Sequence, residues 1–105
     1  MNIHNKSSLA DFWKKHADCR EVLELWYDDV SELEWKKPND VKKAYISASI
    51  IKHDRVVFNI KGNKYRLIVE MNYIKGWVFV KFIGTHAEYD KVNAETVDLY
   101  KAKRK

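Results

Sequence analysis

Residues 55–71, which read RVVFNIKGNKYRLIVEM, decide the predicted fold. Two runs rich in β-branched and aromatic residues, Arg55–Ile60 and Lys64–Met71, flank the tripeptide Lys61-Gly62-Asn63. Glycine and asparagine tolerate positive φ, so this tripeptide favours a tight turn between antiparallel strands. The stretch therefore predicts a β-hairpin with two long arms.

Upstream of the hairpin, the apolar residues follow a helical spacing instead. Ser8 and Asp11 fit a capping box at the start of a first helix, and an apolar stripe over Asp18–Leu33 predicts a second. Pro38 suits the first turn of a short third helix. Asn2–His4 is short enough for an edge strand. Helices thus precede the main strands.

Downstream of the hairpin, a turn over Asn72–Gly76 leads into a third strand, Trp77–Ile83. Three consecutive strands predict an antiparallel meander, with the upstream helices available to cover one of its faces. The 105 residues are enough for one hydrophobic core and hence one domain, 1–105. We predict an α+β fold, with N-terminal helices on one face of a twisted antiparallel sheet and a basic tail at about 101–105.

Composition narrows the class of protein. Hydrophobic residues make up 46% and charged residues 33% of the chain, a globular balance. The single cysteine, Cys19, cannot form an internal disulfide, which favours a reducing compartment. The sequence shows no apolar run long enough for a signal peptide core or a membrane span. We expect a soluble, cytoplasmic protein that does not contact the membrane.

The net charge of +5 is unevenly distributed. Residues 18–35 carry seven acids and one base, a net of −6, whereas residues 36–87 carry eleven bases and three acids, a net of +8. Each stretch taken alone is as well explained by a solvated surface. Their segregation favours a surface on the second half that binds a polyanion such as RNA.

Strand alternation predicts which cations such a surface exposes. In the second strand Tyr65 and Leu67 share one face, which leaves Arg66 on the other. In the third strand Val78, Val80 and Phe82 share one face, and the residues between and beside them share the other: Trp77, Phe79, Lys81 and Ile83. We expect Arg66 and Lys81 on the open face of the sheet, because a charge on the helix-covered face would be costly.

Polar side chains follow the third strand directly. Thr85 or the residues just after it can begin a short helical turn, which places His86 and Tyr89 at the exit of a buried strand. Histidine titrates near neutral pH, tyrosine can hold or donate a proton or stack on a base, and arginine binds two phosphate oxygens at once. An exposed histidine and tyrosine at this spacing also occur as a cap and a packing ring, so spacing alone leaves both interpretations open.

The histidines are scattered and the carboxylates unclustered, so we predict neither a metal site nor a cofactor. What remains is a metal-free set of groups able to cleave RNA, in which the 2′-hydroxyl attacks the adjacent phosphate. Its predicted members are three catalytic residues and three RNA-binding lysines: Arg66, His86 and Tyr89, with Lys61, Lys64 and Lys81.

Two blocks, FNIKGNKYRL and GTHAEYD, together with LADFWKKHAD near the start, closely resemble the HigB toxins of bacterial type II toxin–antitoxin modules, a branch of the RelE-like superfamily. The resemblance covers nearly the whole chain. It implies the RelE-like α+β fold and a metal-independent, ribosome-dependent mRNA endonuclease that cuts translated messages in the ribosomal A site. The functional arginine, histidine and tyrosine of that family match Arg66, His86 and Tyr89.

The resemblance also implies a partner, a small helix-turn-helix antitoxin of the HigA type encoded beside the gene. Two other interpretations remain open. One is a non-catalytic module that binds RNA or the ribosome through the same basic sheet, and the other is a domain that serves only as a partner or corepressor for an antitoxin.

Overall fold

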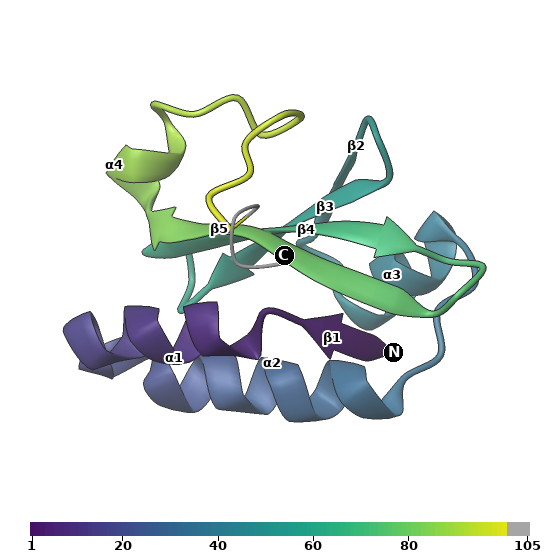
Figure 1. Ribbon diagram of the computed structural model, residues 1–105, viewed down its shortest axis with the longest axis horizontal. Coiled ribbons are helices and arrows are strands. Elements are labelled where there is room, and N and C mark those ends of the chain that lie inside the picture. The colour runs from purple at the N-terminus through teal and green to yellow at the C-terminus, as the bar shows by residue number, and fades with distance from the viewer. Residues whose placement is uncertain (101–105) are drawn as a thin grey trace.

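The computed structural model describes residues 1–100 as one mixed sheet with helices on one side and a C-terminal segment on the other (Figure 1). The predicted basic tail lies outside the described residues. Along the chain the elements are β1 (Asn2–His4), α1 (Lys6–Lys15), a 3-10 turn η1 (Ala17–Cys19), α2 (Arg20–Glu32), α3 (Pro38–Ala44), β2 (Ser49–Ile51), β3 (Arg55–Ile60), β4 (Tyr65–Asn72), β5 (Trp77–Thr85) and α4 (His86–Tyr89).

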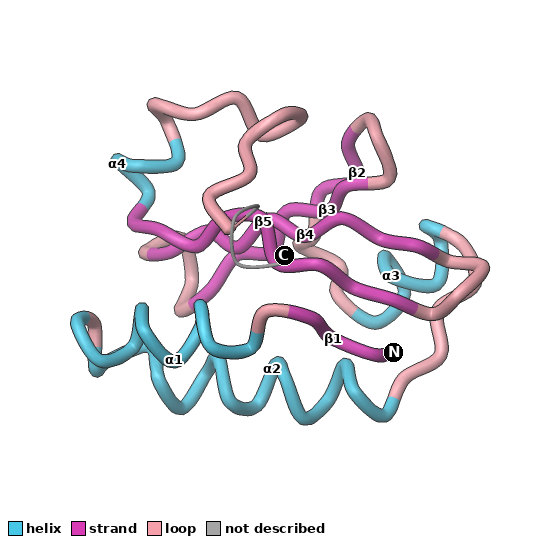
Figure 2. Tube along the Cα trace, in the orientation of Figure 1, coloured by secondary structure: helices cyan, strands magenta, loops and turns pink. Residues whose placement is uncertain are grey.

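The sheet has the strand order β1-β5-β4-β3-β2. β3, β4 and β5 form the predicted antiparallel meander, and Lys61 and Gly62 adopt the positive φ values, 53° and 65°, that the β3–β4 turn requires. Two short strands extend it. β1 pairs with β5 in parallel, and β2, which the sequence did not predict, pairs antiparallel with the start of β3. Figure 2 shows these strands as one twisted layer.

The main core lies between the sheet and the helices α1 and α2, as predicted. Leu9 of α1 and Leu23 and Val30 of α2 are fully buried in one cluster with the inward-facing residues of the central strands. Burial of this much apolar surface is the main stabilisation of the layer. Among residues 1–100, no helix combines the length and apolar character that a bilayer crossing needs.

The predicted capping box at Ser8 is wrong. Asn5 adopts a left-handed φ of 71° and the helix begins at Lys6, one turn earlier than expected. Asparagine tolerates this conformation, so the chain can turn into the helix before it reaches Ser8. Ser8 is buried in the first turn and its hydroxyl donates to the Asn5 carbonyl at 2.5 Å.

The second face of the sheet is not open, which corrects another prediction. Val57, Ile68 and Phe82 form a second apolar cluster on this face. The segment after α4 packs on the cluster through its apolar side chains, and Figure 1 shows this segment and α4 across the sheet from α1 and α2. Arg55, only 5% exposed, binds the segment by donating hydrogen bonds to the carbonyls of Ala94 at 3.1 Å and Val97 at 2.6 Å.

A β-bulge in β5 changes which residues face the helices. Val69 pairs with Val80 but Ile68 pairs with Phe82, so Lys81 is left out of the pairing. Beyond this extra residue the alternation is inverted, because two residues on one strand oppose one on its neighbour. Phe82 therefore lies on the second face, not with Val78 and Val80 as predicted.

Gly84 follows the bulge in a position with no room for a side chain. A Cβ built there would lie 2.6 Å from Cζ of the buried Phe82 ring and 3.0 Å from Oε1 of Glu88. We expect Gly84→Ala to lower the free energy of unfolding by about 1–3 kcal/mol, the usual cost of overpacking. Urea titrations of the wild type and the variant measure the difference.

The control for this prediction is a double-mutant cycle with Phe82→Leu, which shortens the ring that obstructs the new methyl group. The two substitutions should couple favourably, so that the double variant is more stable than the sum of the single effects. Simple additivity would contradict the proposed clash.

Candidate active site

α4 is built so that its side chains are fixed at the end of β5. The Thr85 hydroxyl accepts a hydrogen bond from the Glu88 backbone N–H at 3.2 Å, and the Glu88 carboxylate accepts one from the Thr85 N–H at 2.8 Å. This is a complete capping box. In addition, the His86 N–H donates to the Lys64 carbonyl at 3.0 Å, which ties the helix to the β3–β4 hairpin.

The structure brings Arg66, His86 and Tyr89 together. The guanidinium carbon of Arg66 lies 5.0 Å from the centroid of the Tyr89 ring, and the His86 ring lies 6.5 Å from the same ring, centroid to centroid. Tyr89 is itself packed on the second apolar cluster, 6.5 Å from Phe82. A single anchored ring thus organises a cation and an imidazole that come from different elements.

Arg66 occupies the second face of the sheet between Asn59 of β3 and Gly84 of β5, its register partners. Because Gly84 has no side chain, the space above it is left to the Phe82 ring and the Glu88 carboxylate, and no side chain stands directly opposite the arginine on β5. The Arg66 Nε is buried without a hydrogen-bond partner among the described residues. The half-buried guanidinium is held by its cation–π contact and keeps donors available for an anion.

His86 faces solvent, with 46% of its side chain exposed, and its Nδ1 lies 3.2 Å from Oδ2 of Asp90. A carboxylate at this nitrogen favours the tautomer with a proton on Nδ1 and leaves Nε2 to exchange a proton with a ligand. The arrangement of imidazole, carboxylate and tyrosine gives this corner of the sheet the groups that proton transfer requires.

Lys61 and Lys64 lie on the hairpin beside the site but both are engaged by Asp18. The Lys64 Nζ donates to an Asp18 carboxylate oxygen at 2.5 Å, and the Lys61 Nζ donates to the Asp18 carbonyl at 3.0 Å. The Tyr65 hydroxyl donates to the other Asp18 carboxylate oxygen at 2.6 Å. Both lysines are exposed, and more than half of the Lys64 side chain is accessible to solvent, so a phosphate can still reach them.

Lys81 does not belong to an exposed surface, so the prediction of its accessibility is wrong. It is 4% exposed and its Nζ lies 3.0 Å from Oδ2 of Asp98, beneath the C-terminal segment. The physical reason is the covered second face: a buried ammonium needs a carboxylate partner, and Asp98 supplies it. The burial of Arg55 on the same face was not predicted either, because its partners are brought to it only by the fold. They are two backbone carbonyls of the C-terminal segment and the Glu70 carboxylate, 3.5 Å from the Arg55 Nε.

Among residues 1–100, neither Cys19 nor the acidic side chains add a reactive thiol or a metal site to this cluster. Cys19 is buried, burial raises the pKa of its thiol, and its Sγ donates to the His16 carbonyl at 3.1 Å. Within residues 1–100, no three histidine, cysteine or acidic side chains gather closely enough to hold a metal ion.

Comparison with known proteins defines the class to which this fold and site belong. Residues 19–92 match the family model of the HigB toxin, described as the RelE-like toxic component of a toxin–antitoxin system. The helices on one side of the sheet accord with this class of protein. The chain belongs to the HigB toxin family.

Curated relatives are similar over nearly their whole length. The chain is 28% identical to the mRNA interferase HigB of Escherichia coli O6:H1 over 94 residues, which are 88% of this chain and 91% of the relative. It is 24% identical over 92 residues to the mRNA interferase toxin HigB of Escherichia coli K12 and to the mRNA interferase HigB of Shigella flexneri, in each case 86% of this chain and 88% of the relative.

The Asp18 contacts predict a measurable pH dependence of stability. Hydrogen bonds from Lys64 and then Tyr65 lower the pKa of Asp18 from 3.8 to about 2. A carboxylate with a depressed folded pKa stabilises the fold above its unfolded pKa, and this contribution is lost as the pH falls through the folded pKa. Asp18→Asn should therefore lower the free energy of unfolding at neutral pH, with a deficit that shrinks below about pH 4.

Urea titrations from about pH 6 down to about pH 3 check this expectation. Asp28→Asn, an exposed acid on α2 with no contact to the hairpin lysines, is the matched control. A deficit for Asp18→Asn that is constant over the whole range would show that the carboxylate does not act through its charge.

Proposed function

We propose that this chain is the toxin of a type II toxin–antitoxin module and acts as a ribosome-dependent, metal-independent mRNA endonuclease. Membership of the HigB family and the names of its relatives support the class of activity. The observation that carries the proposal is the convergence of Arg66 and His86 on the Tyr89 ring. These three groups supply anion binding and proton transfer at one edge of the sheet.

The chemistry that fits this set is attack of a ribose 2′-hydroxyl on the adjacent phosphorus. The new bond from O2′ to phosphorus forms as the bond to the 5′ oxygen breaks, which leaves a 2′,3′-cyclic phosphate and a free 5′-hydroxyl. One group takes the proton of the 2′-hydroxyl and another returns one to the leaving oxygen. His86, whose side chain is 46% exposed, is suited to one of these transfers, and the Tyr89 hydroxyl is a candidate for the other.

Arg66 has a different role. A guanidinium does not act as a base at neutral pH, so its contribution is to bind the phosphate and stabilise the charge that grows on it. Its stacking on Tyr89 fixes its plane, which favours a two-pronged contact with phosphate oxygens.

Dependence on the ribosome follows from how few groups the site offers. A single histidine stands at an exposed edge, and a flexible RNA strand would have to be held there in an in-line geometry. We propose that the ribosomal A site supplies this positioning. Rapid cleavage of naked RNA by the purified protein would contradict the proposed dependence on the ribosome.

The proposed partner is a small helix-turn-helix antitoxin encoded beside the gene, which accords with membership of a toxin–antitoxin family. The rival function is a non-catalytic module that binds RNA or the ribosome through the same basic groups. The variants below separate the two.

Arg66→Ala should reduce single-turnover cleavage on programmed ribosomes by about 10²–10³, the usual effect of removing a donor to the transition state. Arg66→Lys should restore little, because an ammonium cannot reproduce the two-pronged contact. A thermal melt of each variant checks the fold, which we expect to change little for a partly exposed side chain outside both apolar clusters. Near-normal cleavage by Arg66→Ala would exclude this residue from the site.

Tyr89→Phe and His86→Ala distinguish a catalyst from a binder. Phenylalanine keeps the ring beneath Arg66 and against Phe82 and removes only the hydroxyl. A catalyst should lose cleavage by about tenfold or more in both variants while its affinity for ribosomes stays unchanged. A binder should instead lose affinity in proportion to its effect on translation.

The matched control for these two variants is Lys91→Ala, an exposed cation just beyond α4. It should preserve both cleavage and ribosome affinity. If Lys91→Ala lowers cleavage as much as His86→Ala does, general charge and not the arrangement around Tyr89 controls the activity.

A further inference from the structure

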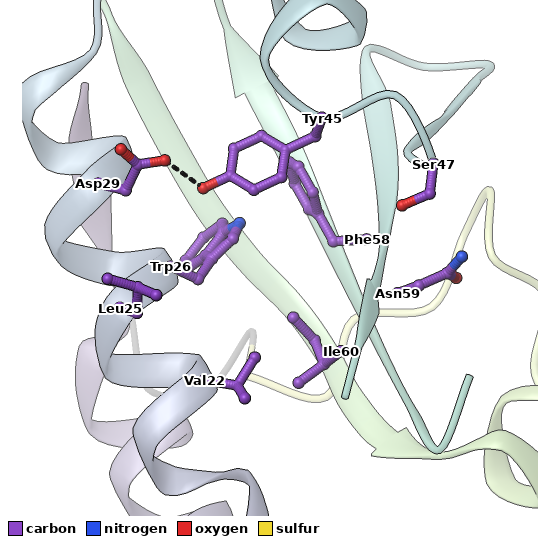
Figure 3. A pocket seen from close by; sticks show the side chains of 9 residues that line it. All are labelled: Val22, Leu25, Trp26, Asp29, Tyr45, Ser47, Phe58, Asn59 and Ile60. Carbon is purple, nitrogen blue, oxygen red and sulfur yellow. Dashed lines mark hydrogen bonds between the residues drawn. The ribbon is translucent and has the colours of Figure 1, made fainter. Parts of the chain in front are cut away.

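An apolar cleft of about 370 Å³ opens on the helix side of the sheet, across the sheet from α4. Figure 3 shows it between α2, the segment after α3 and the end of β3. Its walls are mostly apolar and aromatic, formed by Val22, Trp26, Tyr45, Phe58 and Ile60. Clefts of this kind are typical binding sites, because a ligand there gains much apolar burial for little exposed area.

One wall of the cleft is an unpaired edge of the sheet. β2 pairs only with Arg55–Val57, so the outer edge of Phe58–Ile60 has no neighbouring strand in the part of the chain that the structure describes. A free strand edge offers backbone donors and acceptors to an incoming chain. The Trp26 indole Nε1, which lines the same cleft, is also buried without a hydrogen-bond partner among residues 1–100. Protein backbone brought to this place can supply acceptors.

The rim of the cleft is acidic in a protein that is basic as a whole. Leu25 of α2 is 68% exposed at the rim. Its neighbours on the helix surface, three or four residues away, include Glu21, Asp28 and Asp29. Asp29 accepts a hydrogen bond from the Tyr45 hydroxyl at 2.5 Å, and neither Glu21 nor Asp28 has a basic side chain among its contacts in the described region. Such a rim repels RNA and attracts a cation.

We propose that this cleft is the docking site of the antitoxin partner, which inserts an apolar side chain between α2 and β3 and surrounds Leu25 with lysine or arginine side chains. The inference rests on the toxin–antitoxin pairing of the proposed function. Because α2 and α4 lie on opposite sides of the sheet (Figure 1), the cleft does not open toward α4, although Asn59, which lines it, is the β3 neighbour of Arg66.

The test measures binding of the purified product of the neighbouring gene by calorimetry, with the toxin carrying Arg66→Ala so that cells survive its production. Leu25→Arg, which puts a charge at the mouth of the cleft where the partner's apolar side chain enters, should raise Kd by about 30-fold or more. Asp28→Lys, which reverses a charge on the rim, should raise Kd by a smaller factor, about 3-fold to 10-fold at low salt, chiefly by slowing association. Ile74→Arg is the matched control, since Ile74 is 97% exposed in the β4–β5 turn and should leave Kd unchanged.

A second readout uses the toxin with Arg66 intact. Leu25→Arg should still arrest growth but should no longer be neutralised by the co-expressed partner, whereas Ile74→Arg should remain neutralised. Melting temperatures close to that of the wild type show that the exposed substitutions leave the fold intact.

The outcomes test the location of the docking site separately from the pairing of toxin and antitoxin. Equal Kd values for Leu25→Arg and Ile74→Arg would overturn the docking site and leave the pairing intact. No binding by the parent chain would overturn the pairing with this partner, and the docking site with it. A dimer of the chain alone that Leu25→Arg converts to a monomer would show that a second copy fills the cleft, which contradicts the proposal.

Discussion

The pairing of β4 with β5, and the single extra residue within it, determines the form of the site. Up to Val80 the strands alternate regularly, and beyond Lys81 the faces of β5 are exchanged. Without this bulge Gly84 would point into the helix-covered core and a different residue would stand beside Arg66. With it, Ile83 enters the main core and the residue without a side chain falls beside the arginine. The bulge also places Phe82 under Tyr89.

The C-terminal segment that covers the second face of the sheet also shapes the site. Arg55 and Lys81 are both buried cations, and each holds the C-terminal segment, the first through the carbonyls of residues 94 and 97 and the second through Asp98. The covered part of the face keeps Tyr89 packed from below, while the uncovered part leaves Arg66 and His86 accessible. Two buried charges therefore serve the shape of the site and not its chemistry, which is why a basic sequence here overstates the area available to RNA.

Local signals in the sequence predicted the elements well, and longer-range packing decided the rest. The Lys61–Asn63 turn, the three long strands, the Pro38 helix and the helical turn after Thr85 follow from turn chemistry and periodicity, and the sequence also predicted that Arg66 faces away from the helices. The bulge has no local signature, so the faces of Phe82 and Lys81 were not predictable from alternation. The burial of Lys81 depends on Asp98, seventeen residues away in the chain, which no spacing pattern reveals. Ser8 was a plausible cap, but the left-handed turn at Asn5 starts the helix at Lys6 without a side-chain cap.

The pairing of β1 with β5 has a consequence for the time at which the protein becomes active. Asn2 pairs with Trp77, so β1, the first strand to be synthesised, has no neighbouring strand until β5, the last one, has been made. His86 and Tyr89 follow that last strand, and the ring that supports Arg66 is missing until then. Sheets joined by contacts so distant in sequence form late, after synthesis has delivered both partners. The cluster of Arg66, His86 and Tyr89 therefore cannot assemble until translation of the chain is nearly complete.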